Sequence, residues 1–307
     1  MDPLSKLLSG IRAEGSVVAH AVLPAPWTIR FADRAPLTMI TVLRGGGTLL
    51  SAEGVSTPLR RGDTALVRGP EPFLVADHPD SASGDRYDYE IACFTGDSAC
   101  EGEDLSGIHW GSEENATALI VGAYRTSARR HERLLNSLPT VLVISEDLAC
   151  GWVEEAAISA VNQSAGSQAM VDRLLDWNLV CTLRTWFAQS GPTAPGWFRG
   201  LNDPVLAPAL EALHATPGAP WTVASLAAES GVSRAMFARR FTTVMGQPPL
   251  SYLTECRMDD AEELLSDTDL TVAQVAKRIG YADPFGFSAA FKRHRGLSPT
   301  AFRANAA

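Results

Sequence analysis

The pattern of hydrophobic and polar positions predicts strands in the first half of the chain. Short β-branched or apolar runs alternate there with clusters of Gly, Pro and Asp, which is typical of strands joined by tight turns. Gly45-Gly46-Gly47 and Gly69-Pro70 are predicted turns. Many short strands at close spacing predict an all-β barrel or sandwich. The predicted strands are Met39–Leu43, Thr64–Val67, Phe73–Ala76, Glu90–Phe94 and Leu138–Ile144.

Residues 152–189 have a different pattern, which predicts helix. Leu175, Leu179 and Leu183 recur at four-residue spacing, while Trp177 falls on another face. A helix that is apolar on more than one face must be covered from more than one side. Two interpretations stay open: the helix packs between the barrel and its helical neighbours, or one face forms a homodimer contact. In the second case Leu179 would be an exposed position on that face.

The last hundred residues contain an internal repeat of two helices joined by a glycine turn. Its apolar and glycine positions recur 49 or 50 residues apart. Gly246 and Gly296 suit the left-handed residue that closes a helix, and Leu250–Leu265 predicts a helix between the copies. Pro208 predicts that a helix starting near Asp203 begins late or kinks. The repeated positions are Ala227, Gly231, Phe237, Phe241, Gly246 and Pro249, then Ala276, Gly280, Phe287, Phe291, Gly296 and Pro299; the predicted caps are Thr222, Ser233, Thr271, Asp283 and Ser298.

Each copy of the repeat predicts a helix-turn-helix unit, whose second helix fits the major groove of DNA. With the phenylalanines inward, other positions must face outward, and basic residues gather where a phosphate backbone would run. The groove-facing positions of the second copy have almost no hydrogen-bonding capacity, which puts direct base reading by that half in doubt. The candidate DNA-binding residues are Ser233, Arg234, Ala235, Ala238, Arg239 and Arg240 in the first copy, and Asp283, Pro284, Phe285, Gly286, Ala289, Lys292, Arg293 and Arg295 in the second.

Composition and charge are compatible with these two parts. At 307 residues and 46% hydrophobic, the chain is long enough for two cores. The formal net charge of −9 belongs to residues 1–203, while residues 204–307 balance. What matters for DNA is a basic face rather than the average. No apolar run approaches membrane-spanning length and no signal peptide is evident, so we expect a soluble, cytoplasmic protein without a membrane partner.

The first half offers few groups for catalysis. No two of its histidines form an H-x-H pair, and no hydrolase or nucleotide-binding motif occurs, so we expect no metal, no cofactor and no enzyme activity. Trp27, Phe31 and Phe73 are candidates to line an effector pocket inside the barrel, although core packing explains them equally well. Cys93 and Cys100 are candidates for a redox switch, but acidic neighbours would raise the pKa of both thiols. The five cysteines are odd in number and scattered, so no disulfide framework is expected.

The repeat resembles the DNA-binding domain of the AraC/XylS family of transcription regulators. The residues that carry the resemblance are Ser233–Phe241, Gly246-Gln-Pro-Pro, Tyr252, Arg257, Ala261, Gly280-Tyr281, Phe287, Phe291-Lys292, Gly296-Leu-Ser-Pro299 and Arg303. The first half is similar to the cupin-type sensor domain of one branch of that family. The residues that carry this second likeness are Arg61-Gly-Asp-Thr-Ala-Leu-Val67, Gly122-Ala-Tyr124, Leu134-Leu135 and Leu138-Pro139.

The resemblance implies an α+β protein of two domains: an N-terminal cupin-like β-barrel with appended helices and a C-terminal all-α domain with two helix-turn-helix units. The expected bounds are 1–190 for the sensor, including the packing or dimerisation segment 152–189, then 191–203 for a linker and 204–307 for the DNA-binding domain. Implied partners are double-stranded DNA, a small-molecule effector, RNA polymerase and a second copy of the chain. Two alternatives stay open: a redox-responsive regulator using Cys93 and Cys100, and a cupin enzyme with a helical appendage.

Overall fold

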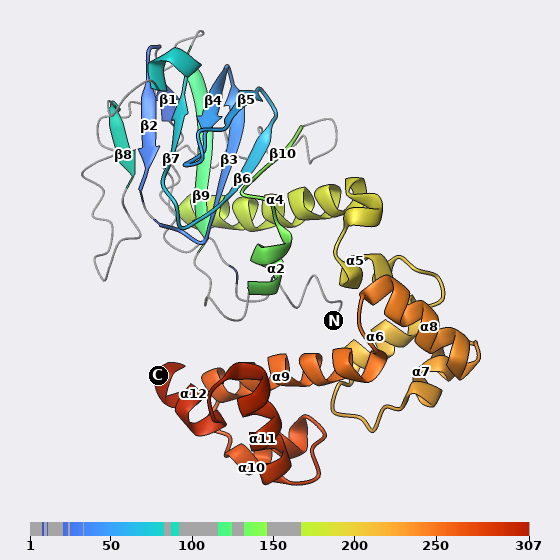
Figure 1. Ribbon diagram of the computed structural model, residues 1–307. Coiled ribbons are helices and arrows are strands. Elements are labelled where there is room, and N and C mark those ends of the chain that lie inside the picture. Colours follow the sequence, from blue (N-terminus) through green and yellow to red (C-terminus); the bar gives the residue numbers. More distant parts are fainter. Residues whose placement is uncertain are drawn as a thin grey trace. The chain divides into compact units, whose positions relative to one another are not determined.

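The chain folds into two compact units, one within residues 8–189 and the other within residues 190–307. A computed structural model describes residues 8, 11, 21–23, 25–32, 34–82, 87–91, 116–124, 132–145 and 167–306 (Figure 1). None of the helices in these ranges has the length and apolar run that a bilayer crossing needs.

The N-terminal unit consists of two five-stranded sheets. Neighbouring strands are antiparallel except β2 and β8, which are parallel. The first sheet has the order β1 (Ala21–Leu23), β9 (Thr117–Tyr124), β3 (Leu37–Arg44), β6 (Thr64–Arg68) and β10 (Val141–Ile144). The second has the order β5 (Ser56–Arg60), β4 (Gly46–Leu50), β7 (Phe73–Ala76), β2 (Thr28–Phe31) and β8 (Tyr89–Ile91); the short helices η1 (Pro79–Ala82) and α2 (Glu132–Ser137) complete the described elements apart from α4.

The core of this unit lies between the two sheets. Side chains alternate along β2, so that Ile29 and Phe31 are buried in the core while Arg30 points the other way. Phe31 stacks on Phe73 of the neighbouring strand with ring centroids 4.6 Å apart. Trp27, only 1% exposed, belongs to the same cluster. The three aromatic candidates from the sequence are therefore members of one packed apolar layer.

Three adjacent glycines, predicted as one turn, have separate roles. Gly45 has a φ of +74° and makes the turn, but Gly46 and Gly47 lie inside β4, so the prediction is wrong for those two. A Cβ atom at Gly47 would lie 2.7 Å from the main-chain oxygen of Ala76 and 3.2 Å from the ring of Trp27. The missing side chain therefore allows close approach between strands and core, which is a known use of glycine within strands.

The long helix α4 (Ser167–Gln189) packs against the first sheet (Figure 1). The Tyr124 hydroxyl donates to the main-chain oxygen of Leu175 at 2.8 Å, and Asn178 Nδ2 donates to the Thr41 hydroxyl at 3.0 Å. A Cβ atom at Gly122 would lie 2.8 Å from the Leu175 side chain. Gly122-Ala-Tyr124 therefore forms the seat on which α4 lies. Residues 152–166 of the predicted segment lie outside the described residues.

One position on α4 was wrongly predicted. Leu179, expected on an exposed face, is 2% exposed and packs towards the sheet. Trp177 and Met170 are 55% and 53% exposed instead. The apolar pattern alone did not indicate which of several apolar faces meets the sheet, and the packing surface includes the polar residue Asn178.

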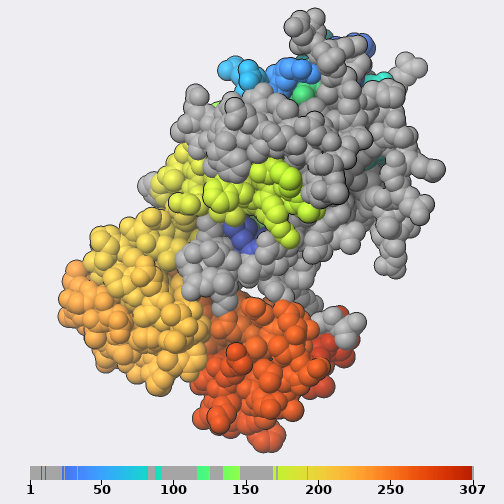
Figure 2. All heavy atoms as spheres, turned by 180° about the vertical axis from the view of Figure 1, so that it is seen from behind, coloured from blue at the N-terminus to red at the C-terminus, as the bar shows by residue number. Residues whose placement is uncertain are grey.

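The C-terminal unit is helical and has two apolar clusters, one for each copy of the repeat. Helix α9 contributes to both, with Tyr252 and Leu253 in the first cluster and Ala261 and Leu265 in the second. Figure 2 shows the two copies as rounded lobes, one yellow to orange and the other deeper orange. The helices are α5 (Gly196–Leu201), α6 (Ala207–Ala215), α7 (Val223–Glu229), α8 (Arg234–Met245), α9 (Pro249–Asp267), α10 (Val272–Arg278), α11 (Pro284–Arg295) and α12 (Pro299–Ala306).

The predicted linker 191–203 contains helical structure at the start of this unit. A short helix, η3 (Gly191–Thr193), and α5 lie within that range, and α5 packs against α8. Helix α6 begins at Ala207, so the helix near Pro208 starts late, as one of the two predicted alternatives requires.

Candidate nucleic-acid interface

The first helix-turn-helix unit consists of α7, the turn at residues 230–233 and α8. Thr222 and Ser225 form a reciprocal capping box at the start of α7. The Ser233 hydroxyl accepts a hydrogen bond from the N–H of Met236 at 3.3 Å and so caps α8. Gly246 closes α8 with a φ of +76°. These local devices fix the bounds of both helices where the sequence predicts them.

The second unit repeats this construction with α10, residues 279–283 and α11. Thr271 and Gln274 form its capping box. The Asp283 carboxylate accepts from the N–H groups of Phe285 and Gly286 at 2.9 and 2.8 Å. Gly296 closes α11 with a φ of +77°. The predicted second turn, one residue longer than the first, is present.

The second helix of each unit, α8 or α11, is its recognition helix, and the inward faces of these two helices match. Phe237 and Phe241 of α8, and Phe287 and Phe291 of α11, are all fully buried. Each pair has ring centroids 5.6 Å apart. Because these rings anchor the helices to their cores, the opposite faces must point to solvent.

The exposed face of α8 carries two arginines that are available for DNA. Arg234 and Arg239 are exposed, as is Ala235, while Ala238 is half-buried. Within the described part of the chain, neither arginine forms an ion pair. Their guanidinium groups can therefore bind phosphates or the edges of bases without giving up an internal partner.

The exposed face of α11 is chemically different. Phe285 is 87% exposed, and Gly286 and Ala289 beside it are exposed too. The nearby Ser288 hydroxyl donates to the main-chain oxygen of Pro284 at 2.8 Å, so its hydrogen is already engaged within the helix. The central part of this face offers an aromatic ring, a methyl group and bare backbone.

Cationic side chains follow at the C-terminal end of α11. Lys292 and Arg293 are exposed. Arg295, grouped with them on sequence, is largely buried and binds two carboxylates of α9: its Nη2 lies 2.6 Å from Asp259 Oδ1, and its Nε pairs with Glu262. Arg295 therefore ties α11 to α9.

Arg240 of α8 also has an internal partner. Its guanidinium nitrogens lie 2.8–3.0 Å from both carboxylate oxygens of Asp203. Arg240 and Arg239 are neighbours in sequence, but only Arg239 is without an ion pair among the described residues. Sequence spacing alone gave no means of separating these two roles.

Two further arginines brace the loops that precede the first helix of each unit. Arg257 donates to the main-chain oxygens of Pro217 and Ala219 at 2.9 and 2.8 Å, and burial lowers the pKa of its guanidinium. Arg303 donates to the main-chain oxygens of Leu265, near the end of α9, and of Leu270, in the corresponding loop before α10. Both residues were part of the sequence resemblance, and their role here is structural.

One candidate contact was missed on sequence. Met236, in the first turn of α8, is 43% exposed next to Ala235. An apolar side chain on an exposed helix face is a possible partner of a thymine methyl group. The next residue, Phe237, is fully buried. Two adjacent apolar residues at the start of a helix do not reveal from sequence alone that Met236 is the one that faces solvent.

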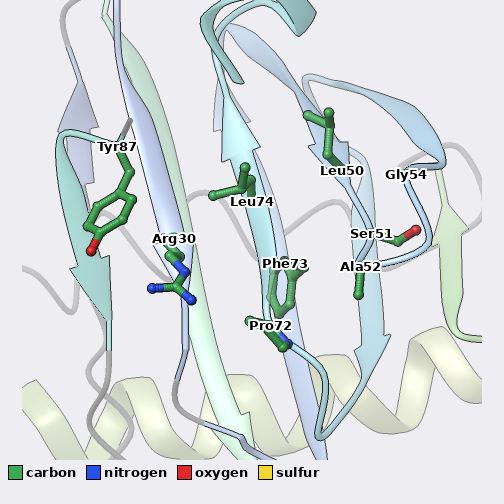
Figure 3. Close-up of a pocket in the computed structure, with 9 residues that line it drawn as sticks. All are labelled: Arg30, Leu50, Ser51, Ala52, Gly54, Pro72, Phe73, Leu74 and Tyr87. Carbon is green, nitrogen blue, oxygen red and sulfur yellow. The ribbon is translucent and has the colours of Figure 1, made fainter. Parts of the chain in front are cut away.

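The described part of the sensor unit has a pocket of about 430 Å³ on the outer face of the second sheet (Figure 3). Arg30 pairs across strands with Leu74, and Leu74 with Leu50, so these outward side chains form a row. Arg30 Nη1 lies 3.0 Å from Glu90 Oε2, and its guanidinium lies over the Tyr87 ring, 5.5 Å from the centroid. The lining residues are Arg30, Leu50, Ser51, Ala52, Gly54, Pro72, Phe73, Leu74 and Tyr87.

The remaining candidates of this unit divide into two groups. Phe73 reaches the pocket, whereas Trp27 and Phe31 do not line it. Cys93 and Cys100 lie outside the described residues. No cluster of His, Cys, Asp and Glu suited to a metal ion occurs among the residues that the structure describes.

Comparisons with known proteins match both units. A family described as cupin matches residues 2–188, and one described as a helix-turn-helix domain matches residues 226–305. A putative AraC-like transcription regulator of Streptomyces lividans is 31% identical over 99% of this chain and 98% of its own length. The HTH-type transcriptional regulator AlkR of Acinetobacter baylyi is 28% identical, with 99% of each chain covered.

A solved structure matches the C-terminal unit alone. The DNA-binding domain of AdpA, in complex with a target DNA, is 35% identical over 34% of this chain and 92% of that chain, with a TM-score of 0.32.

The cupin region and the paired helix-turn-helix units define a DNA-binding transcription regulator. The chain belongs to the AraC family of such regulators, since the likeness to the Streptomyces lividans relative spans both domains. The predicted family and two-domain α+β fold are confirmed.

Proposed function

We propose that this regulator reads bases mainly through α8 and uses α11 mainly to hold the DNA backbone. The observation that carries the proposal is the contrast between two recognition helices of the same construction. Arg234 and Arg239 are exposed and without ion pairs within the described chain, whereas the corresponding face of α11 offers Phe285 and Ala289. Arginine makes bidentate contacts to guanine, whereas an apolar ring contacts only a thymine methyl group.

The roles of the other candidate DNA-binding residues follow from their positions on α8 and α11. Ser233 and Asp283 cap the recognition helices, where N-terminal N–H groups approach phosphates. Ala235, Ala238 and Gly286 allow close approach of the helix backbone to the groove. Lys292 and Arg293 bind phosphates, which fix register without reading sequence.

The experiment that tests this function is selection of duplexes from a random pool by the full-length chain. A binding series that substitutes each base pair of the selected duplex then follows. We expect strong discrimination in the half-site under α8 and weak discrimination about one helical turn away, ~34 Å, under α11. Equal discrimination in both half-sites would contradict the proposal.

The sensor unit, on this proposal, binds a small-molecule effector between its sheets. The supporting observation is the Trp27 indole N–H, which is buried and has no hydrogen-bond acceptor among the described residues. An unsatisfied buried donor costs about 1–3 kcal/mol, so a ligand with an acceptor atom next to the Phe31–Phe73 stack would gain that bond.

A thermal-shift screen of metabolites tests the effector, because a ligand that binds only the folded state raises the melting temperature. Trp27→Phe keeps an aromatic ring and removes the N–H, so the shift should shrink in this variant. Trp221→Phe, in the C-terminal unit, is the matched control. An unchanged shift in Trp27→Phe would place the effector elsewhere, with the pocket at Arg30 as the next candidate.

We also propose that the sensor domain ends at residue 190. The exposed face of α4, on this proposal, mediates homodimerisation. The protein acts with RNA polymerase rather than as an enzyme. Trp177 and Met170 are the exposed apolar residues on α4 that support a dimer contact. Stoichiometric metal in the purified protein would instead support an enzyme.

A further inference from the structure

The segment that opens the C-terminal unit lies directly against the first recognition helix. Helix α5 packs beside the last turn of α8 (Figure 1). A Cβ atom at Gly196 would lie 2.8 Å from the main-chain oxygen of Met245, and one at Gly200 would lie 2.5 Å from the Met245 sulfur. Real Cβ atoms do not approach so closely, and glycine is the residue that permits such contacts. The two glycines, one helical turn apart, therefore provide the surface on which Met245 rests.

A cationic side chain of α5 reinforces this contact at the C-terminus of α8. Arg199 Nη2 donates to the main-chain oxygen of Val244 at 2.7 Å. Val244 is in the last turn of α8, where main-chain oxygens lack partners within the helix and carry the negative end of the helix dipole. Arg199 therefore satisfies one of these oxygens and attaches the end of α8 to α5.

An ion pair holds the middle of α8. Arg240 donates from Nε to Asp203 Oδ1 and Oδ2 at 3.0 and 2.9 Å, and its Nη2 lies 2.8 Å from Oδ2. Asp203 is 8% exposed, and its Oδ1 also accepts from the N–H groups of Val205 and Leu206. Burial opposes ionisation, but these donors hold the pKa of Asp203 below its ordinary value. Removing Arg240 would thus leave a buried carboxylate without its cation.

The geometry points to a role for this segment that builds on the function proposed above. We propose that residues 196–203 form a clasp that sets how α8 sits in the major groove, and that Arg240 is a positioning residue of the clasp and not a phosphate contact. The clasp holds α8 at its middle, through Arg240, and at its end, through Val244 and Met245. Arg239, next to Arg240, is left to face the DNA. Base reading requires recognition side chains to be placed within fractions of an ångström.

The two roles of Arg240 are separated by Arg240→Lys. Lysine keeps the charge and still binds a phosphate, but it lacks the planar fork that grips both oxygens of Asp203. Asp203→Asn tests the other partner, since an amide keeps the acceptor oxygen for the N–H groups of Val205 and Leu206 and loses the charge. Both variants and their double are made in the full-length chain, with Arg60→Lys in the N-terminal unit as the matched control.

Binding is measured to two probes: a fluorescent duplex selected from a random pool by the unmodified chain, and an unselected random duplex. We expect each single variant to bind the selected duplex ~10-fold more weakly, and the double variant to lose about the same ~10-fold, because the two residues share one interaction. Affinity for the unselected duplex and the slope of affinity against salt should stay at the control value. The lost base preference should fall on the half-site under α8 alone.

Other outcomes would overturn the clasp. Full affinity in Arg240→Lys, together with a salt slope flattened by ~0.9 in Arg240→Gln, would make Arg240 a phosphate contact. Loss of preference in both half-sites, with a lowered melting temperature, would make the ion pair a general stabiliser without a positioning role. If the unmodified chain selected no duplex, the proposed function itself would be wrong, and the clasp with it.

Discussion

Arg239 of α8 and Ala289 of α11 occupy the same position in the two copies of the repeat, each two residues after the first buried phenylalanine of its helix. Both are exposed, so a long cationic side chain in one recognition helix corresponds to a methyl group in the other. Five residues earlier, the exposed Arg234 corresponds to the half-buried Pro284, which has no hydrogen-bonding side-chain atom. The cores and caps of the two units are alike, and their DNA-facing surfaces are not.

The first prediction follows for Arg239. Arg239→Ala should lower affinity for the selected duplex by ~10-fold or more, corresponding to the ~1–3 kcal/mol of a bidentate base contact, and should relax preference at one base pair. The measurement is a base-substitution binding series. Arg60→Ala, which removes an exposed arginine from the sensor unit, is the control and should change nothing. A uniform loss across all base pairs would indicate that Arg239 binds phosphate.

A second prediction concerns Phe285, which is 87% exposed and has no polar side-chain atom. If its ring contacts a thymine methyl group, replacing that thymine by deoxyuridine removes the partner without changing any hydrogen-bonding group. Deoxyuridine should then weaken binding of the unmodified chain and leave Phe285→Ala unaffected. Equal losses in both proteins would show that the ring is not the reader of that methyl group.

The third prediction concerns Lys292 and Arg293 at the C-terminal end of α11. Lys292→Ala or Arg293→Ala should weaken binding to selected and unselected duplexes alike, and should flatten the slope of log affinity against log salt by ~0.9 for each lost phosphate contact. Titrations at several salt concentrations check this. An unchanged slope would mean that the residue does not reach the DNA backbone.

A fourth prediction compares the two turn glycines. Both have positive φ, +65° at Gly231 and +84° at Gly280. A Cβ atom at Gly231 meets nothing within 4 Å, whereas one at Gly280 would clash with the main-chain oxygen of Gly218 and approach Arg257. Gly231→Ala should cost ~1–2 kcal/mol of unfolding free energy from backbone strain alone, and Gly280→Ala clearly more. Denaturant unfolding measures both, and equal costs would contradict the close approach.

The repeat could be predicted from the sequence because its determinants are local. Caps such as Thr271, closing glycines such as Gly296 and phenylalanines four residues apart act within one or two helical turns. The roles of Arg240 and Arg295 could not be predicted in this way. Their partners, Asp203 and Asp259, lie 37 and 36 residues away, and an exposed-looking basic cluster is equally compatible with phosphate binding.

Most of the remaining differences between the predicted elements and those of the structure lie at glycine residues. Gly46 and Gly47 belong to the predicted turn, and Gly196 and Gly200 fall within the predicted linker 191–203, yet the four residues lie in β4 and α5. In each case the missing side chain makes room for a neighbour from a distant part of the sequence, Trp27 for Gly47 and Met245 for Gly200. A sequence shows where a side chain is missing but not which neighbour fills the space, so these elements become visible only in the fold.

The last prediction concerns α4 and corrects the choice of residue made on sequence. Trp177 is 55% exposed and Leu179 is 2% exposed, so only Trp177→Glu places a charge on the outward face. If that face joins two copies, light scattering should show dimers for the unmodified chain at micromolar concentration and monomers for Trp177→Glu. Leu179→Glu should instead destabilise the sensor unit, because a carboxylate would be buried against the sheet without a partner. A chain that is already monomeric, or a Trp177→Glu variant that remains dimeric, would exclude this face as the contact.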